Sequence, residues 1–243
     1  MRILALYDIH GNPDALDAVI EDPRAREADV VVIGGDVAPG PFVAATLDRL
    51  QALPDPVLWI RGNGEREVAG AAAGVPPADD AGNAALSAAF TAREIGLDRA
   101  HALGKLPLAI TIDGVLFCHA SPRRDDEMLT RLSAPGRWAA ALDGVKARLV
   151  VAGHTHQQDD RVVNGVRFVN AGSVGLPYEG DGDARWLWVQ DGVAALRRTA
   201  YDSAAAGVRM RDACSPAADS VTAALIEPVD AIVVTRMFEE RAG

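Results

Sequence analysis

Residues 149–156 read Leu149-Val150-Val151-Ala152-Gly153-His154-Thr155-His156, an apolar run followed by a glycine and two histidines. The apolar run is typical of a buried β-strand. The glycine after it predicts a sharp turn, because glycine adopts backbone conformations that other residues avoid. Such a turn can direct both imidazoles toward one point beyond the end of the strand. Since imidazole is a good ligand for first-row divalent metals, the stretch predicts a metal site.

Earlier in the chain, other short apolar runs are also followed by residues that can bind a metal. The runs at 2–7, 30–33 and 57–60 predict three parallel strands, separated by helices that begin at Pro13 and near residue 42. In open α/β sheets, ligands bind at the carboxyl ends of such strands. The candidate ligands that follow the three runs are Asp8, His10, Asp36 and Asn63.

The second half of the chain is rich in hairpin signals. Residues 108–118 predict a hairpin around Asp113-Gly114 that leads directly into His119. Further hairpins are predicted around Asn164-Gly165 and Asp191-Gly192. This half is therefore expected to be mostly antiparallel, and His119 joins His154 and His156 as a candidate ligand.

The segments between these strands have weaker patterns. The Ala-, Gly- and Pro-rich residues 69–83 predict a loop, and residues 84–103 predict one helix. A polar loop at 123–127 is followed by predicted helical segments to about residue 143. Residues 203–243 form a weakly patterned tail, with a predicted helix near 203–212 and an apolar run at 231–234.

Composition limits the possible function classes. The chain has 243 residues, of which 49% are hydrophobic, and its formal net charge is −10. This charge argues against a broad nucleic-acid surface, which needs clustered Lys and Arg. The cysteines Cys118 and Cys214 make no disulfide framework, and the apolar N-terminal run is too short for a signal segment or a membrane span. We therefore expect a cytoplasmic protein with no membrane partner.

Two carboxylates, four imidazoles and one amide oxygen exceed what a single ion needs. They suit two ions that share a bridging carboxylate, an arrangement that activates water and supports displacement at phosphorus. The mixture of nitrogen and oxygen donors favours Mn, Fe, Zn or Co over Mg or Ca. The seven candidate ligands are Asp8, His10, Asp36, Asn63, His119, His154 and His156.

These motifs, taken together and in this order, resemble the calcineurin-like metallophosphoesterase superfamily, in particular its small bacterial phosphodiesterase-like members. The resemblance spans about residues 8–156, and the Asn170-Ala171-Gly172-Ser173 turn is similar to one in those members. It implies an α/β fold, a four-layer α/β/β/α sandwich with two mixed sheets and a dinuclear metal site at the carboxyl ends of the strands. Residues 1–202 would form this domain. Residues 203–243 would be a helical extension that packs on the domain or lies at a dimer interface.

The resemblance also implies a role for each candidate ligand. Asp8, His10 and His156 would hold the first ion, and Asn63, His119 and His154 the second, with Asp36 bridging both. Asp36, Asn63 and His119 are the expected catalytic residues. The implied cofactors are two divalent transition-metal ions, with Mn expected first and Fe, Zn, Co or Ni possible. A metal-bridging hydroxide would attack the phosphorus, without a covalent enzyme intermediate.

The chain departs from the family pattern at one position. Many members have a histidine after the asparagine of Gly-Asn, where it contacts substrate and can protonate the leaving oxygen. This chain has Gly64 there, in Gly62-Asn63-Gly64-Glu65. Loss of such a proton donor typically costs about 10²–10⁴ in rate, so phosphodiesterase activity is favoured. The candidate substrate-binding residues are Glu65, Arg66, Ser121 and Tyr178.

Several alternatives remain open at this stage. A phosphomonoesterase, a dinucleoside polyphosphate hydrolase and a non-catalytic metal-binding scaffold, like the retromer subunit that resembles a phosphoesterase, are all compatible with the motifs. The missing histidine at Gly64 favours the scaffold, whereas retention of every candidate ligand favours the enzyme. The expected partner is a small phosphorylated substrate, and a homo-oligomer is possible.

Overall fold

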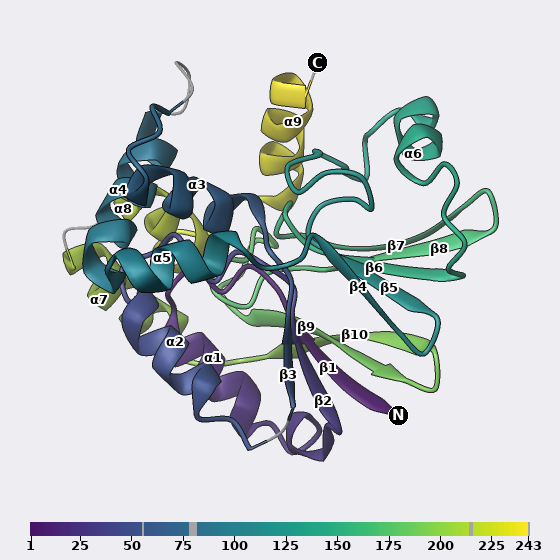
Figure 1. The fold of residues 1–243 in the computed structure, drawn as a ribbon, viewed down its shortest axis with the longest axis horizontal. Helices are drawn as coiled ribbons and strands as arrows, with labels where there is room; N and C mark the ends of the chain where they lie inside the picture. The colour runs from purple at the N-terminus through teal and green to yellow at the C-terminus, as the bar shows by residue number, and fades with distance from the viewer. Residues whose placement is uncertain (55, 78–81, 214–215, 243) are drawn as a thin grey trace.

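Two β-sheets stacked face to face form the centre of the structure (Figure 1). The computed structural model describes residues 1–54, 56–77, 82–213 and 216–242. In the first sheet the strand order is β10-β9-β1-β2-β3. Strands β1, β2 and β3 are parallel, whereas β9 is antiparallel to β1, so the sheet is mixed. The bounds are β1 Arg2–Leu6, β2 Val30–Ile33, β3 Val57–Trp59, β9 Ala184–Gln190 and β10 Val193–Thr199.

The second sheet is also mixed and has the order β4-β5-β6-β8-β7. Its central strand β6 is parallel to both neighbours, and the two outer pairs are antiparallel hairpins. The expectation that this half is mostly antiparallel is therefore only partly correct. The bounds are β4 Ala109–Ile112, β5 Val115–Cys118, β6 Leu149–Ala152, β7 Gln158–Val163 and β8 Val166–Ala171.

Alternation along β1 explains how the first sheet is buried on both faces. Ile3 and Ala5 pack into the core between the sheets, whereas Leu4 and Leu6 pack against the helices on the other face. Successive side chains of a strand point to opposite faces, so an almost continuous apolar run supplies both layers. This is why residues 3–6 read as apolar throughout.

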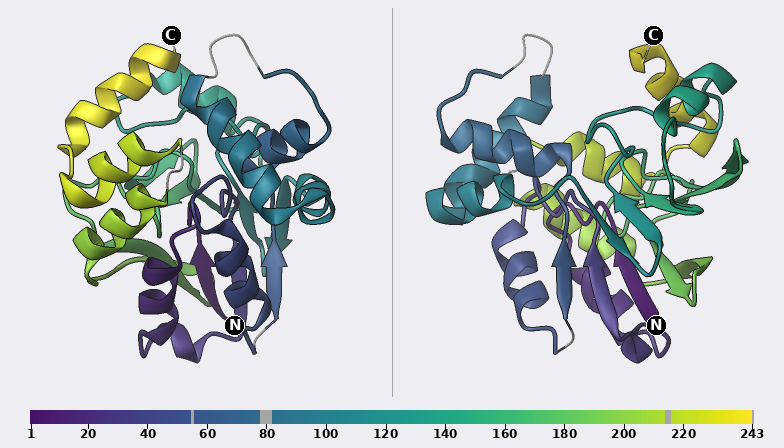
Figure 2. Two further views of the ribbon diagram at one scale, coloured as in Figure 1. Left: turned by 90° about the vertical axis from the view of Figure 1, so that its left-hand side faces the viewer. Right: turned by 45° about the vertical axis from the view of Figure 1, so that its right-hand side comes forward.

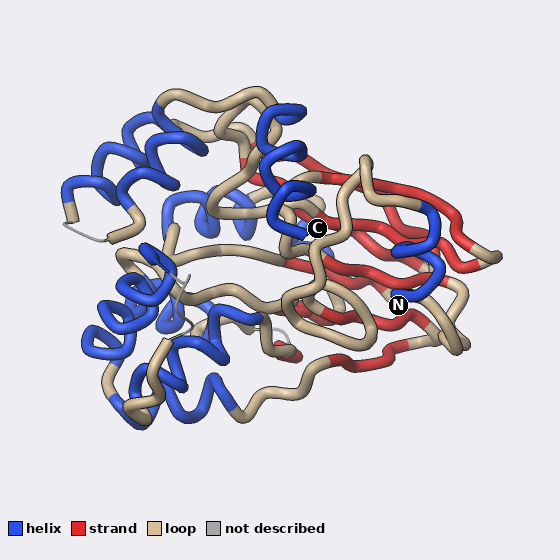
Figure 3. Tube along the Cα trace, turned by 90° about the horizontal axis from the view of Figure 1, so that it is seen from above, coloured by secondary structure: helices blue, strands red, loops and turns tan. Residues whose placement is uncertain are grey.

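Helices cover the outer faces of both sheets and complete four layers, as predicted from the family resemblance. The helices on the first sheet contribute to one apolar core, and α6 contributes to a separate core with the second sheet. Figure 2 shows the first sheet with its neighbouring helices, and Figure 3 shows most helices on one side and the strands on the other, with a short helix beside the strands. The bounds are α1 Pro13–Glu21, α2 Val43–Gln51, α3 Asn63–Ala72, α4 Gly82–Ile95, α5 Leu97–Gly104 and α6 Pro135–Ala141.

Three predicted segments, one loop and two helical regions, differ from the structure. Helix α3 extends to Ala72, so the predicted loop at 69–83 begins too early, and its residues 78–81 lie outside the described ranges. The single helix expected over 84–103 is two helices, because Gly96 between them has a φ of +82°. Helix α6 covers only part of the segment expected to be helical up to residue 143.

The C-terminal segment packs on the same chain. It comprises α7 Ser203–Asp212, α8 Ala218–Val221, a π-helical turn Thr222–Ile226 and α9 Ala231–Ala242. Helix α7 was predicted, and the apolar run at 231–234 is the start of α9. The division of the chain at residue 202 stays a prediction. Within the described ranges, none of the helices has the length and apolar character needed to cross a membrane.

Candidate metal centre

The loops that follow β1, β2, β5 and β6 bring two groups of metal-binding side chains together. The first group is Asp8, His10 and His156, and the second group is Asp36, His119 and His154. Within each group the potential ligand atoms lie within 4.8 Å of one another. Residues that are far apart in the chain therefore meet at the carboxyl ends of strands from both sheets.

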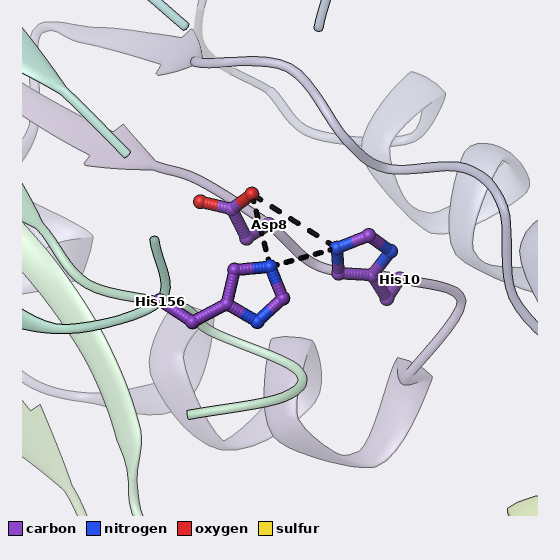
Figure 4. Close-up of side chains that lie close together, drawn as sticks. All are labelled: Asp8, His10 and His156. Carbon is purple, nitrogen blue, oxygen red and sulfur yellow. Dashed lines mark hydrogen bonds and ion pairs between the residues drawn. The ribbon is translucent and has the colours of Figure 1, made fainter. Parts of the chain in front are cut away.

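The first group is tightly packed around the carboxylate of Asp8. His156 Nε2 lies 3.4 Å and His10 Nε2 lies 3.9 Å from Asp8 Oδ1, and the two Nε2 atoms are 3.1 Å apart (Figure 4). The three ligand atoms thus face a common point, as a shared cation requires.

The carboxylate of Asp36 lies between the two groups. Its Oδ1 is 3.5 Å from His119 Nε2 and its Oδ2 is 3.8 Å from His10 Nε2. Each oxygen therefore faces a different group, which is the arrangement that a bridging ligand needs. Asp8 Oδ1 is also 3.8 Å from His119 Nε2, so the two groups are adjacent.

Asn63 begins α3 directly after Gly62, whose backbone lies beside the Asp36 carboxylate. The Asn63 amide donates from Nδ2 to Glu67 at 3.2 Å, which leaves Oδ1 as the atom available to a ligand. Among the described residues, Asn63 Oδ1 is buried and accepts no hydrogen bond. The same holds for other candidate ligand atoms, namely Asp8 Oδ1, His119 Nε2 and His154 Nε2. Unpaired buried polar atoms are costly, so their concentration here fits a centre built for cations.

Three of the imidazoles are oriented by the backbone in a way that suits metal binding. In each, Nδ1 donates to a carbonyl oxygen, which leaves the Nε2 lone pair free. The pairs are His10 with Pro39 (2.9 Å), His119 with Gly34 (2.9 Å) and His156 with Leu176 (2.7 Å). This tautomer is the one in which Nε2 can act as a ligand, so the donor set fits two divalent ions.

The electrostatics of the second group favour a bound cation. Burial, and then the neighbouring His119, lower the pKa of His154 to about 4. Burial also acts to lower the pKa of His119, but the Asp36 and Asp8 carboxylates outweigh it and raise the pKa to about 10. Without a metal, a proton on His119 therefore supplies the positive charge that Asp36 and Asp8 require. Metal binding to this group is expected to release that proton.

Most of the candidate ligands have an unusual backbone conformation. Non-glycine residues with positive φ are uncommon and concentrate at functional sites. The glycine after β6 was predicted to allow a sharp turn, but the structure gives it another role. A Cβ at Gly153 would lie 2.4 Å from Asp8 Oδ2, so the glycine lets the Asp8 carboxylate approach the backbone closely. The left-handed residues are Asp8 (54°), His10 (47°), Asp36 (53°), His154 (71°) and His156 (57°).

Glu65 is a positioning residue in this structure. Its side chain is 1% exposed, and its Oε2 accepts from the backbone N–H groups of Asp36 and Gly62, both at 2.8 Å. Its Oε1 accepts from the N–H of Ala38 at 3.1 Å. Burial and the nearby Asp36 carboxylate raise the pKa of Glu65 to about 7. These bonds join the loops that carry Asp36 and Asn63 and occupy both oxygens, and the predicted contact between Glu65 and substrate stays a prediction.

Gly64 lies in a space that admits no side chain. A Cβ at this position would lie 2.0 Å from the carbonyl oxygen of Ala38 and 2.8 Å from Pro39 Cδ. The histidine that many family members have here therefore could not be accommodated without moving the loop at residues 38–39. The loop at residues 38–39 and the glycine at position 64 are therefore matched to each other in this chain.

The Gly64→Ala substitution is expected to lower the free energy of unfolding by about 1–3 kcal/mol, since the added methyl group overlaps Ala38. Gly70→Ala is the matched control on α3, because its Cβ meets only Val75 Cβ, at 3.8 Å. The control is expected to be stabilising by about 0.5–1 kcal/mol, as alanine is favoured over glycine inside a helix. Urea denaturation of both variants tests this, and equal stability changes would contradict it.

The other predicted substrate-binding residues have partners within the chain. Arg66 donates to Asp125 through Nε and Nη2, both at 3.0 Å, and to Asp126 at 3.2 Å. The Ser121 hydroxyl accepts from the N–H of Arg124 at 3.2 Å, so it stabilises a turn. These contacts do not bring either side chain to a ligand group. Their predicted substrate roles stay predictions.

Tyr178, by contrast, lies directly beside the first group. Its ring stacks on the imidazole of His156, with centroids 5.0 Å apart and an interplanar angle of 10°. Its backbone N–H also donates to the carbonyl oxygen of His156 at 3.1 Å. The structure therefore places Tyr178 at the candidate site, with contacts that orient a ligand.

Sequence reasoning missed a buried polar network behind the ligands. Asn170 Nδ2 donates to the Gly153 carbonyl at 2.6 Å and to Thr155 Oγ1 at 3.0 Å, so it holds the loop of His154 and His156. The Ser173 hydroxyl donates to the Asp8 carbonyl at 2.7 Å. The signal available was the Asn170–Ser173 turn, which was noted only as a resemblance. Its role in holding two ligand loops required the structure.

Comparisons with known proteins identify the family and the fold. A family model described as the calcineurin-like phosphoesterase superfamily domain matches residues 1–189. A solved metallophosphoesterase from Sphaerobacter thermophilus has 22% identity and a TM-score of 0.73, with 94% of this chain and 100% of that chain covered. A hypothetical protein from Pyrococcus horikoshii OT3 has 17% identity and a TM-score of 0.76, with 92% and 97% covered. At these identities the two structures show a common fold. A comparison with curated proteins found no match.

Proposed function

Because the chain belongs to the calcineurin-like phosphoesterase superfamily, a family of metal-dependent hydrolases of phosphate esters, we propose that it hydrolyses phosphodiesters in preference to phosphomonoesters. The observation that carries this preference is the closed space at Gly64. The enzyme class follows from the family, whereas the preference is argued from the residues around the candidate metal centre.

We propose that the first and second groups each hold one divalent ion, with Asp36 shared between them and Asn63 completing the second site. Manganese is the expected ion, since the donors mix imidazole nitrogen with carboxylate and amide oxygen. Two ions in such a centre activate water and offset the charge on the phosphoryl group. The chain contributes the orientation of its ligands through the carbonyl contacts of the imidazoles and the Glu65 network.

The closed space at Gly64 limits how the leaving group can be protonated. A side chain at this position cannot donate a proton, because even a Cβ would overlap the Ala38 carbonyl. Without a positioned acid, esters of weakly acidic alcohols are poor substrates, whereas esters with better leaving groups are less affected. This favours substrates whose leaving oxygen carries its own stabilisation.

The charge around α3 supports the same preference. Arg61 and Arg66 are the cations nearest in sequence to Asn63 and Gly64, and both pair with Asp125, while Arg66 also pairs with Asp126. A phosphomonoester carries close to two negative charges at neutral pH, whereas a diester carries one. Because Arg66 is already paired, it does not offset the second negative charge of a monoester. A diester has no second charge to offset.

The test is a hydrolysis assay on metal-stripped protein to which Mn²⁺ is added back. Bis-p-nitrophenyl phosphate is compared with p-nitrophenyl phosphate, and then with diesters of progressively less acidic phenols. We expect activity that depends on Mn²⁺, a higher kcat/KM for the diester, and a steep fall in rate as the leaving phenol becomes less acidic.

The outcomes separate the alternatives. Preference for the monoester would overturn the diester proposal and leave the phosphoesterase class intact. A shallow dependence on the leaving group would show that another group supplies the proton. Protein that binds Mn²⁺ but hydrolyses neither ester would favour the scaffold.

A further inference from the structure

The imidazole of His156 is held from several sides by a short segment that follows β8. The imidazole Nδ1 donates to the Leu176 carbonyl at 2.7 Å. The backbone carbonyl oxygen of His156 accepts from the Tyr178 N–H at 3.1 Å. The Tyr178 ring lies parallel to the imidazole, with centroids 5.0 Å apart. The direction in which His156 Nε2 points, toward Asp8, therefore depends on where Tyr178 lies.

Helix α9 supports Tyr178 from the other side. The ring of Phe238, on α9, meets the Tyr178 ring edge-on, with centroids 6.0 Å apart and an interplanar angle of 66°. Aromatic pairs in this geometry add about 0.5–1.5 kcal/mol beyond burial. Phe238 and Tyr178 thus connect the C-terminal helix to a candidate metal ligand through two ring contacts.

The same helix is also bonded to the residue next to His156. Gln157 Nε2 donates to the Ala231 carbonyl at 2.8 Å, and Thr235 Oγ1 donates to Gln157 Oε1 at 2.7 Å. Both side chains are buried, with Gln157 4% and Thr235 0% exposed. Loss of either partner would leave buried polar atoms unpaired, so these bonds fix α9 against the His156 loop.

The far end of α9 is anchored to the loop before α6 (Figure 1). Glu239 accepts from the hydroxyls of Thr130 at 2.6 Å and Ser133 at 2.5 Å, and it pairs with Arg137 at 3.2 Å. The helix is therefore held at both ends, which makes it a rigid support for Phe238. The region matched by the family model ends at residue 189, so this support lies outside it.

We propose that α9 is a positioning element of the metal centre, which keeps the Tyr178 ring against His156 and thereby maintains the affinity of the first group for its ion. The inference rests on the proposed role of the first group as metal ligands. It assigns to the C-terminal segment a function that the ligand motifs do not require. Groups that orient metal ligands typically contribute about 10–100-fold in metal affinity.

The experiment is a calorimetric titration of metal-free full-length protein with Mn²⁺. The test variants are Phe238→Ala and Tyr178→Leu, and the conservative variant is Tyr178→Phe, which keeps the ring. Val234→Ala is the control on the same helix, since Val234 is buried on α9 at 7% exposure. His156→Ala and His154→Ala identify which binding event belongs to the first and which to the second group.

We expect Phe238→Ala and Tyr178→Leu to weaken the first-group event by about 10-fold or more and to leave the second unchanged. Tyr178→Phe and Val234→Ala are expected to retain both events. Should Phe238→Ala fail to fold, the Tyr178→Leu and Tyr178→Phe pair makes the same comparison with α9 intact.

Two results would overturn the inference. Wild-type affinity at both events in Phe238→Ala and Tyr178→Leu would show that the rings do not orient the ligand. Equal weakening of both events, shared by Val234→Ala, would show general destabilisation. Wild-type protein that binds no Mn²⁺ would instead refute the proposed metal centre, and the inference would fall with it.

Discussion

Asp36→Asn is expected to lower kcat/KM by at least about 10³-fold and to reduce the bound metal from two ions per chain. The carboxylate faces His119 through Oδ1 at 3.5 Å and His10 through Oδ2 at 3.8 Å. Asparagine removes the negative charge and replaces one donor oxygen with an NH₂ group. It keeps an Oδ1 that can accept from the Gly64 N–H, now at 2.8 Å, so the fold is expected to be retained.

The measurement combines steady-state hydrolysis of the diester with metal analysis of the dialysed protein. Asp48→Asn makes the same chemical change at an exposed site, where Asp48 pairs with Arg99 at 2.7 Å. This control is expected to keep full activity. Wild-type activity in Asp36→Asn with two ions bound would show that Asp36 does not join the two sites.

Glu65→Ala is expected to lower the free energy of unfolding of the metal-free protein by about 3–5 kcal/mol. Glu65 is the acceptor for three backbone N–H groups, those of Asp36, Ala38 and Gly62. Alanine leaves these buried donors without a partner, and each unpaired donor costs about 1–3 kcal/mol. The two ligand loops lose the group that joins them.

Urea denaturation of metal-free protein provides the measurement, with Glu67→Ala as the matched control. Glu67 lies on the same helix and is half-buried, but its carboxylate accepts a hydrogen bond from Asn63 at 3.2 Å rather than from the backbone. The control is expected to cost about 1 kcal/mol or less. Similar losses in the two variants would mean that the Glu65 network contributes little.

The positions of the ligands could be predicted because each follows a short apolar run. Strand ends are encoded locally. Asp8 comes two residues after the end of β1, Asp36 three residues after β2, and His154 two residues after β6. The carboxyl ends of parallel strands meet at one edge of a sheet, so local order along the chain was enough to bring together the ligands within each sheet. The family resemblance supplied the stacking of the two sheets.

The supporting contacts could not be predicted, because they depend on pairs far apart in the sequence. Phe238 reaches Tyr178 across two segments whose apolar pattern is weak, and Arg66 reaches Asp125 from a different element. A buried glutamate that accepts only from backbone N–H groups, as Glu65 does, looks in the sequence like any other acidic residue of a helix. The break at Gly96 was missed because glycine is also tolerated inside helices.

The left-handed backbone at five of the candidate ligands limits how this centre can change by mutation. Glycine enters this region freely, asparagine, aspartate and histidine are enriched there, and β-branched residues are strained. A descendant that no longer needs the metals is therefore expected to replace His10 or His154 with Asn, Asp or Gly rather than with Val, Ile or Thr. Two of these three replacements still offer an oxygen to a cation. The geometry of the loops would thus preserve weak ion binding after catalysis is lost, and recovery of the enzyme would need few substitutions.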